Sequence, residues 1–75
     1  MTFAEKLYYL RTENGYSQET LAETLNVSRQ SISKWELGTS LPETEKIIAI
    51  GELFGVSLDS LLRDSVSLDT KENLD

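Results

Sequence analysis

The sequence contains no cysteine and no histidine. Without cysteine it can form no disulfide framework, no thiolate metal site and no cysteine nucleophile. Any catalysis would have to rest on carboxylates, hydroxyls or lysine. The acidic residues are scattered over the outer faces of the predicted helices, where no pocket could shift their pKa values. We therefore expect no enzymatic activity, no metal site and no cofactor.

Long apolar segments are also missing. No run approaches the roughly 18 apolar residues that a membrane-spanning helix requires. Met1 is not followed by the basic segment and apolar core that make up a signal peptide. We expect a cytoplasmic protein with no signal peptide and no membrane partner.

Basic residues are few: seven Lys and Arg stand against 13 Asp and Glu, a formal net charge of -6. Nucleic-acid binding needs a basic face, so this balance argues against it at first. The acid is unevenly distributed, however. Residues 1–38 hold four basic and five acidic residues, a net -1, and residues 39–75 hold three basic and eight acidic residues, a net -5. An acidic C-terminal end would orient the protein near DNA and lower its non-specific affinity.

The length of 75 residues suits one small domain of marginal stability, because such a chain buries only about 60–65% of its unfolded surface. Apolar residues at helical spacing predict an all-α bundle of five short helices. We place them at about residues 2–14, between Ser17 and Asn26, and at residues 28–37, 43–54 and 58–63. Residues 1–63 should form the domain. Residues 64–75 are polar and acidic, and we interpret them as a disordered tail or linker.

Residues 17–38 predict two short helices joined by a tight turn. Ser17 and Ser28 can each accept a hydrogen bond at the start of a helix. Asn26 stands where the chain must leave the first of these helices, and Asn tolerates the left-handed conformation. Ile32 and Trp35 form the inward face of the second helix. Its outward residues are Arg29, Gln30, Ser33 and Lys34.

The remaining apolar positions complete the expected core. Gly15, Gly38 and Gly55 suit the ends of helices. Tyr8 and Tyr9 lie off the inward face of the first helix, so we interpret them as one partly buried and one surface ring. The expected inward residues are Phe3, Leu7, Leu10, Leu21, Ala22, Leu25, Ile32, Trp35, Ile47, Ile50, Leu53, Phe54, Leu58, Leu61 and Leu62, with Ile48 at the edge.

This pattern resembles the helix-turn-helix of the phage-repressor and Cro family, also called the XRE family. The resemblance covers about residues 3–62 and implies a fold similar to that of the lambda and 434 repressors. It also implies an ion pair between Arg11 and Glu36 that ties the first helix to the recognition helix. The position of Gln18 implies a phosphate contact. The matching residues are Gln18, Leu21, Ala22, Val27, Ser28, Ile32, Trp35, Glu36 and Gly38.

A helix-turn-helix places the N-terminal half of its second helix in the major groove, so the outward residues are predicted to read base edges. Arg29 can donate to O6 and N7 of guanine, and Gln30 can pair with N6 and N7 of adenine. Ser33 can contact several base edges, and Lys34 can bind guanine or a phosphate. The predicted phosphate contacts are Ser17, Gln18, Ser28, Thr39, Ser40 and, more weakly, Lys46.

The resulting hypothesis is a sequence-specific DNA-binding transcriptional regulator, with repression favoured, that binds an inverted repeat in double-stranded DNA as a homodimer. The neighbourhood of Phe54, Val56 and Leu58 is one candidate for the dimer surface, and a further C-terminal domain or protein partner is another. The alternative is a protein-interaction module of the same fold, an antitoxin or regulator partner that does not itself bind DNA strongly. The net charge of -6 favours this alternative. The basic and amide side chains on one helix face argue against it.

Overall fold

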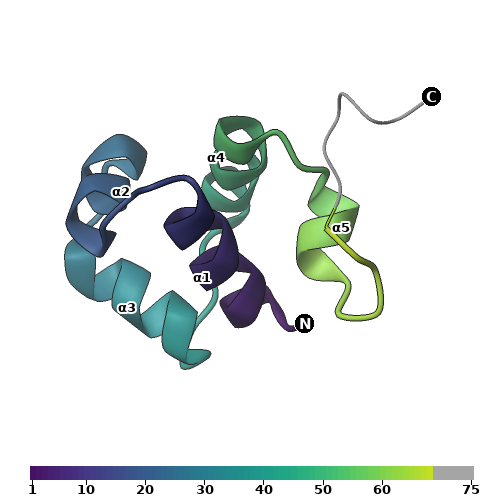
Figure 1. Ribbon diagram of the computed structural model, residues 1–75. Helices are drawn as coiled ribbons and strands as arrows, with labels where there is room; N and C mark the ends of the chain where they lie inside the picture. Colours follow the sequence, from purple (N-terminus) through teal and green to yellow (C-terminus); the bar gives the residue numbers. More distant parts are fainter. Residues whose placement is uncertain (69–75) are drawn as a thin grey trace.

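The computed structural model describes residues 1–68, which form five helices and no strand. Figure 1 shows α2 and α3 on one side of the molecule and α5 on the other, with α1 and α4 between them. The predicted all-α bundle is therefore confirmed. No helix within residues 1–68 has the length and apolar character to cross a membrane. The helices are α1 (Phe3–Glu13), α2 (Gln18–Leu25), α3 (Arg29–Leu37), α4 (Thr44–Phe54) and α5 (Leu58–Leu62).

Polar side chains begin most of these helices. At the start of α1 the Thr2 hydroxyl accepts from the Glu5 N–H, and the Glu5 carboxylate accepts from the Thr2 N–H. Ser17, Ser28 and Ser57 begin α2, α3 and α5, each by accepting from the N–H three residues later. Such a cap stabilises a helix by about 1 kcal/mol. Of the helices within residues 1–68, only α4 begins without a side-chain cap.

The turn between α2 and α3 depends on a left-handed residue. Asn26 adopts φ 58° and ψ 47°, and it is the one non-glycine residue of the described chain with positive φ. Asn tolerates this region better than most other residues. The predicted interruption at Asn26 is confirmed. It lets α3 turn back at once and pack on α2.

The core lies where the five helices meet. Its buried apolar residues are Phe3, Leu7, Leu10, Leu21, Ala22, Leu25, Ile32, Trp35, Ile50, Val56 and Leu61. Ile47, Leu53 and Phe54 are only partly buried against this core. Ile48 is 40% exposed, at the edge of α4 where the sequence predicts it.

The fifth helix buries less of its surface than predicted. Leu61 is fully buried, but Leu58 is 39% exposed and Leu62 is 48% exposed. A helix of five residues completes little more than one turn, so it presents only one narrow face to its neighbours. The prediction that all three leucines cover the core is therefore wrong for Leu58 and Leu62.

A buried lysine, which no sequence pattern indicates, joins α1 to the chain after α5. Lys6 is 1% exposed. Its ammonium donates to the carbonyls of Ser60, of Arg63 at 2.6 Å and of Val66 at 2.7 Å. An ammonium group has three N–H donors, and the last carbonyls of a helix lack partners within it. Lys6 therefore uses all three donors, on a carbonyl within α5 (Ser60), on that of its C-cap (Arg63) and on one in the chain that follows (Val66).

Residues 64–68 belong to the segment whose composition predicts a tail. Here they lie against the helices: Val66 accepts from Lys6, and Leu68 packs against the core. The reason is the buried ammonium of Lys6, which holds the backbone of this segment. The rest of the predicted tail, residues 69–75, lies outside the described residues.

Candidate nucleic-acid interface

α3 is apolar on one side and polar on the other. Ile32 is fully buried and Trp35 is 7% exposed. The opposite side, called here the α3 outer face, consists of Arg29, Gln30, Ser33 and Lys34. Ser33 is half-buried, and the other three residues are exposed. Residues 29 and 33, like residues 30 and 34, are four positions apart, so the four side chains share one surface of the helix. This surface presents two positive charges and several hydrogen-bonding groups to solvent.

A nearly buried ion pair joins α1 to α3. Arg11 Nε lies 2.6 Å from Glu36 Oε2, and Arg11 Nη2 lies 3.0 Å from Glu36 Oε1. Only 11% of the Arg11 side chain and 7% of the Glu36 side chain are exposed. Hydrogen bonding to this carboxylate raises the pKa of Arg11 above its ordinary value. Arg11 Nη1 also donates to the carbonyl of Tyr16 at 3.0 Å, which holds the chain just before α2.

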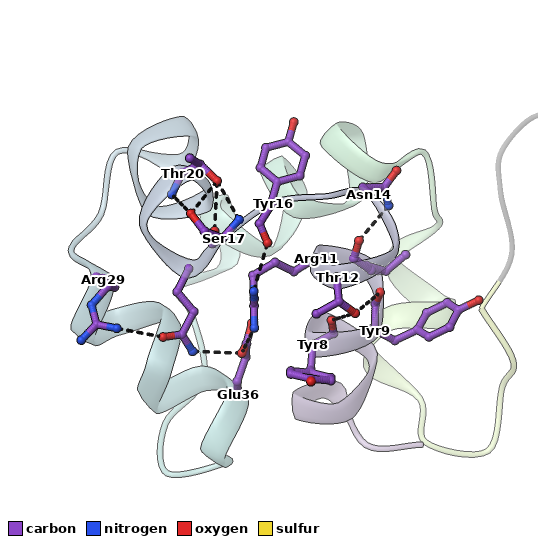
Figure 2. Close-up of polar contacts among 12 residues, drawn as sticks. Tyr8, Tyr9, Arg11, Thr12, Asn14, Tyr16, Ser17, Thr20, Arg29 and Glu36 are labelled. Carbon is purple, nitrogen blue, oxygen red and sulfur yellow. Dashed lines mark hydrogen bonds and ion pairs between the residues drawn. The ribbon is translucent and has the colours of Figure 1, made fainter.

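Gln18, the first residue of α2, connects this ion pair to the α3 outer face. Its Nε2 donates to Glu36 Oε1 at 3.1 Å, and its Oε1 accepts from Arg29 Nη1 at 3.3 Å. Four polar side chains therefore form a continuous series in the order Arg11, Glu36, Gln18, Arg29. Figure 2 shows how this series runs from Arg11 of α1 to Arg29 at the start of α3.

A hollow of about 530 Å³ lies beside the start of α2. It is lined by Arg11, Ser17, Gln18, Glu19 and Arg29. The first N–H groups of a helix have no partner within the helix, and they favour an anion. Its wall carries the exposed Arg29 guanidinium and the Glu19 carboxylate, and the Arg11 guanidinium is already engaged by Glu36 and the Tyr16 carbonyl.

The two serines predicted to contact phosphate also serve as helix caps. Ser17 Oγ accepts from the Thr20 N–H at 3.0 Å, and Ser28 Oγ accepts from the Ser31 N–H at 3.1 Å. Both serines are exposed. The Ser17 hydroxyl also donates to Thr20 Oγ1 at 3.0 Å, so its contact with a phosphate would have to replace that bond.

The loop after α3 carries two further predicted contacts. Thr39 and Ser40 are exposed and follow Gly38, which ends α3 in the left-handed conformation at φ 78°. The Thr39 hydroxyl donates to the carbonyl of Lys34 at 3.1 Å. The same carbonyl also accepts from the Thr39 N–H at 3.0 Å, and the two bonds place Thr39 next to the helix end.

Lys46 has a partner inside the protein. Its Nζ donates to the Leu25 carbonyl at 2.7 Å, and the side chain is half-buried. A cation at the C-terminal end of a helix is stabilised by the helix dipole. In this position Lys46 ties α4 to the end of α2, whereas its sequence position alone suggested a phosphate contact.

Two contacts near the interface were not predicted. The guanidinium carbon of Arg11 lies 5.3 Å from the centre of the Tyr8 ring, a cation–π distance, and Tyr8 is 55% exposed. Their spacing of three residues on one helix is the signal that could have indicated this contact. The bond between Gln18 and Arg29 joins two helices, and no sequence spacing indicates it. Tyr9 is 46% exposed, so both tyrosines are surface rings and the prediction that one of them is partly buried is wrong.

Comparison with known proteins places this geometry in context. A sequence model described as helix-turn-helix matches residues 7–61. The HTH-type transcriptional activator BcrR of Enterococcus faecalis is 45% identical over 75 residues, which cover 97% of this chain and 37% of that protein. The HTH-type transcriptional regulator ImmR of Bacillus subtilis strain 168 is 32% identical over 75 residues, or 99% of this chain and 59% of that protein.

A solved structure resembles the fold directly. The P22 c2 repressor, crystallised in complex with synthetic operator 9T, superposes with a TM-score of 0.79 and 27% sequence identity. The match covers 84% of this chain and 96% of that one. By contrast, this chain spans 37% and 59% of the lengths of the two curated relatives.

Proposed function

Because the chain belongs to the XRE-type helix-turn-helix family, we propose that it is a sequence-specific DNA-binding transcriptional regulator. The observation that carries this proposal is the α3 outer face, where Arg29, Gln30, Ser33 and Lys34 stand together opposite the buried Ile32 and Trp35. An exposed helix of this kind has the size and the polar groups that the major groove accepts.

The N-terminal half of α3 reads the bases. Arg29 donates to O6 and N7 of a guanine, and Gln30 pairs with N6 and N7 of an adenine. Each such pair contributes about 1–3 kcal/mol of discrimination against a wrong base. Ser33 and Lys34 follow one turn later and contact neighbouring base edges or a phosphate.

Phosphates on either side hold the helix in register. One phosphate occupies the hollow at the start of α2, where Gln18 Nε2 keeps a second N–H besides the one that it donates to Glu36. Ser17 and Ser28 add hydroxyl contacts, and Thr39 and Ser40 meet the backbone at the far end of α3. With about three to five phosphate contacts per protomer, log K falls with log salt at a slope of about -3 to -4.

One domain of this size reads about half of an operator, so the protein acts as a homodimer on an inverted repeat with half-sites about one helical turn apart. Val56 is 2% exposed and contributes nothing to a dimer surface. We favour repression, because occupation of an operator excludes other proteins without any further contact. The regulator works in the cytoplasm, on the nucleoid, and it needs no cofactor and no catalytic group.

Selection from a pool of random DNA duplexes, followed by affinity measurements at about 50 and 200 mM salt, tests the proposal. We expect an enriched inverted repeat whose affinity falls steeply over this range. If the folded protein enriches no sequence, even as an artificially linked dimer, the proposal is wrong. The α3 outer face would then belong to a protein-interaction module, which the net charge of -6 favours.

A further inference from the structure

We infer that Glu36 is a positioning residue for DNA reading. Glu36 does not itself contact the α3 outer face. It orients the Gln18 amide, and the amide in turn holds Arg29. The role of Glu36 at the DNA rests on the proposed function. The way in which Glu36 orients Gln18 and Arg29 rests on hydrogen bonds within the protein. The ion pair of Arg11 with Glu36 would then do more than join α1 to α3.

The first step follows from which atoms can donate and accept. A carboxylate only accepts hydrogen bonds and a guanidinium only donates them. Gln18 stands between the two kinds of group, with Nε2 at 3.1 Å from Glu36 Oε1 and Oε1 at 3.3 Å from Arg29 Nη1. A rotated amide would bring its oxygen against the carboxylate and its NH₂ group against the guanidinium. Only one orientation of the amide satisfies both neighbours.

The second step is that Glu36 cannot turn away. Its two carboxylate oxygens accept from two nitrogens of Arg11, at 2.6 and 3.0 Å, and 7% of its side chain is exposed. Arg11 is in turn held by the Tyr16 carbonyl. The acceptor that orients Gln18 is therefore fixed by α1, by the chain before α2 and by α3 itself.

The third step concerns Arg29, which is exposed and begins α3. A long exposed side chain loses conformational freedom when it binds a base, and an existing partner reduces this loss. Gln18 Oε1 supplies that partner at the base of the α3 outer face. Figure 2 shows the dashed contacts that lead from Glu36 to Arg29.

Replacing Glu36 by Gln would change this arrangement at one point. A glutamine at position 36 has an NH₂ group, which can donate to Gln18 Oε1 and compete with Arg29 for that oxygen. Gln18 is then free to adopt either orientation, and Arg29 loses its fixed acceptor. The guanine contact weakens, while the contact of Gln30 with its own base does not depend on this series.

The experiment has one part without DNA and one with DNA. In the wild-type protein, NMR should show one Gln18 side-chain amide proton shifted downfield of its position in a free glutamine by the Glu36 carboxylate, and a restricted Arg29 Nε–H. If the Gln18 amide protons have the shifts of a free glutamine and Arg29 Nε–H is fully mobile, the inference is wrong. This part needs no variant, so a folding defect cannot obscure it.

In the second part, Glu36→Gln, Gln18→Met and the control Glu19→Gln are compared on the selected operator. Glu19→Gln also removes one carboxylate charge, and Glu19 lines the hollow beside Gln18 and Arg29, but it lies outside the series. We expect Glu36→Gln and Gln18→Met to reduce the preference for guanine opposite Arg29 by about 3- to 10-fold. Glu19→Gln should leave this preference unchanged, and in the Gln18→Met background Glu36→Gln should have no further effect on it.

An unchanged guanine preference in folded Glu36→Gln would overturn the inference while leaving the proposed function intact. If the wild-type protein selects no DNA sequence at all, the proposed function fails instead. The NMR measurement then still decides whether Glu36 orients Gln18 and Arg29. If Glu36→Gln does not fold, Gln18→Met, which keeps the Arg11–Glu36 ion pair, decides the DNA step.

Discussion

Trp35 and Arg29 stand on opposite sides of the same helix, so replacing Trp35 should destabilise the protein strongly and replacing Arg29 should not. Trp35→Ala empties a large volume in the core and should lower the free energy of unfolding by about 3–5 kcal/mol. So small a domain should then be largely unfolded. Urea denaturation followed by circular dichroism measures this change.

Arg29→Ala is the matched control, because Arg29 is exposed. Its replacement should change the free energy of unfolding by no more than about 0.5 kcal/mol. If Arg29→Ala unfolded the protein and Trp35→Ala did not, the inner and outer sides of α3 would have been assigned the wrong way round.

Arg11 is the counter-charge of the Glu36 carboxylate at a nearly buried position. Arg11→Met keeps most of the side-chain volume but leaves that carboxylate without its counter-charge. We expect a loss of about 3 kcal/mol in the free energy of unfolding. Asp59→Asn, which breaks the exposed pair of Asp59 with Arg63 at 2.9 Å, is the control and should cost less than about 1 kcal/mol. Equal losses for both variants would show that burial of the Arg11 pair has no energetic importance.

Lys6 makes a similar test possible at the other end of α1. Lys6→Met leaves the carbonyls of Ser60, Arg63 and Val66 without their shared donor. A buried polar group without a partner costs about 1–3 kcal/mol. We expect a loss of this size and faster amide hydrogen exchange in α5 and residues 63–66, with little change in α2 and α3. Unchanged exchange in α5 would mean that the lysine is not what holds this segment.

Among the elements, α1 begins with a cap whose strength depends on pH. The bond from the Thr2 N–H lowers the pKa of Glu5 below its ordinary value of 4.5. The pKa of Glu5 is lower in the folded protein than in the unfolded chain. The charged cap therefore stabilises the protein above pH 4.5, and this stabilisation is lost as the pH falls through the folded-state pKa. Glu5→Gln can keep the hydrogen bond but cannot titrate. Denaturation at pH 7 and at about pH 3 should therefore show a difference between wild type and Glu5→Gln that shrinks in acid.

Helix boundaries follow largely from local chemistry, and this is why the sequence predicts them to within one residue for α1, α3, α4 and α5. Asn26 ends α2 in the left-handed conformation, and Ser28 caps the start of α3. Each acts within a single helical turn. The α3 outer face is predictable for the same reason, because Ile32 and Trp35 alone determine which side of the helix is buried.

Contacts between distant segments could not be predicted in this way. Lys6 looks like a surface residue in the pattern of α1, and its three carbonyl partners lie 54 to 60 residues further along the chain. Lys46 likewise reaches the end of α2 only because the helices pack as they do. The exposure of Leu58 and Leu62 depends on how α5 meets its neighbours. The Arg11–Glu36 pair could be expected only from the family resemblance.

At the scale of the whole molecule, the α3 outer face and α5 lie at opposite ends of the fold (Figure 1). Figure 1 places α2 and α3 at the side of the molecule away from α5. In the described part of the chain, residues 39–68 hold two basic and five acidic residues, a net -3, compared with -1 for residues 1–38. Asp59 and Asp64 belong to the α5 end. Arg63 at the same end pairs with Asp59, so little net charge remains there to orient the protein. The approach to DNA therefore depends on the α3 outer face itself.

The most direct test of the central claim, that the α3 outer face reads DNA sequence, is parallel selection of random duplexes by the wild type, by Gln30→Ala and by Asp59→Asn. Our account predicts one inverted repeat for the wild type and for Asp59→Asn, whose changed residue lies in α5. Gln30→Ala should lose about 5- to 150-fold of its preference at one adenine in each half-site and keep its preferences elsewhere. Identical base preferences for Gln30→Ala and the wild type, or no enriched sequence for the folded wild-type protein, would contradict the account.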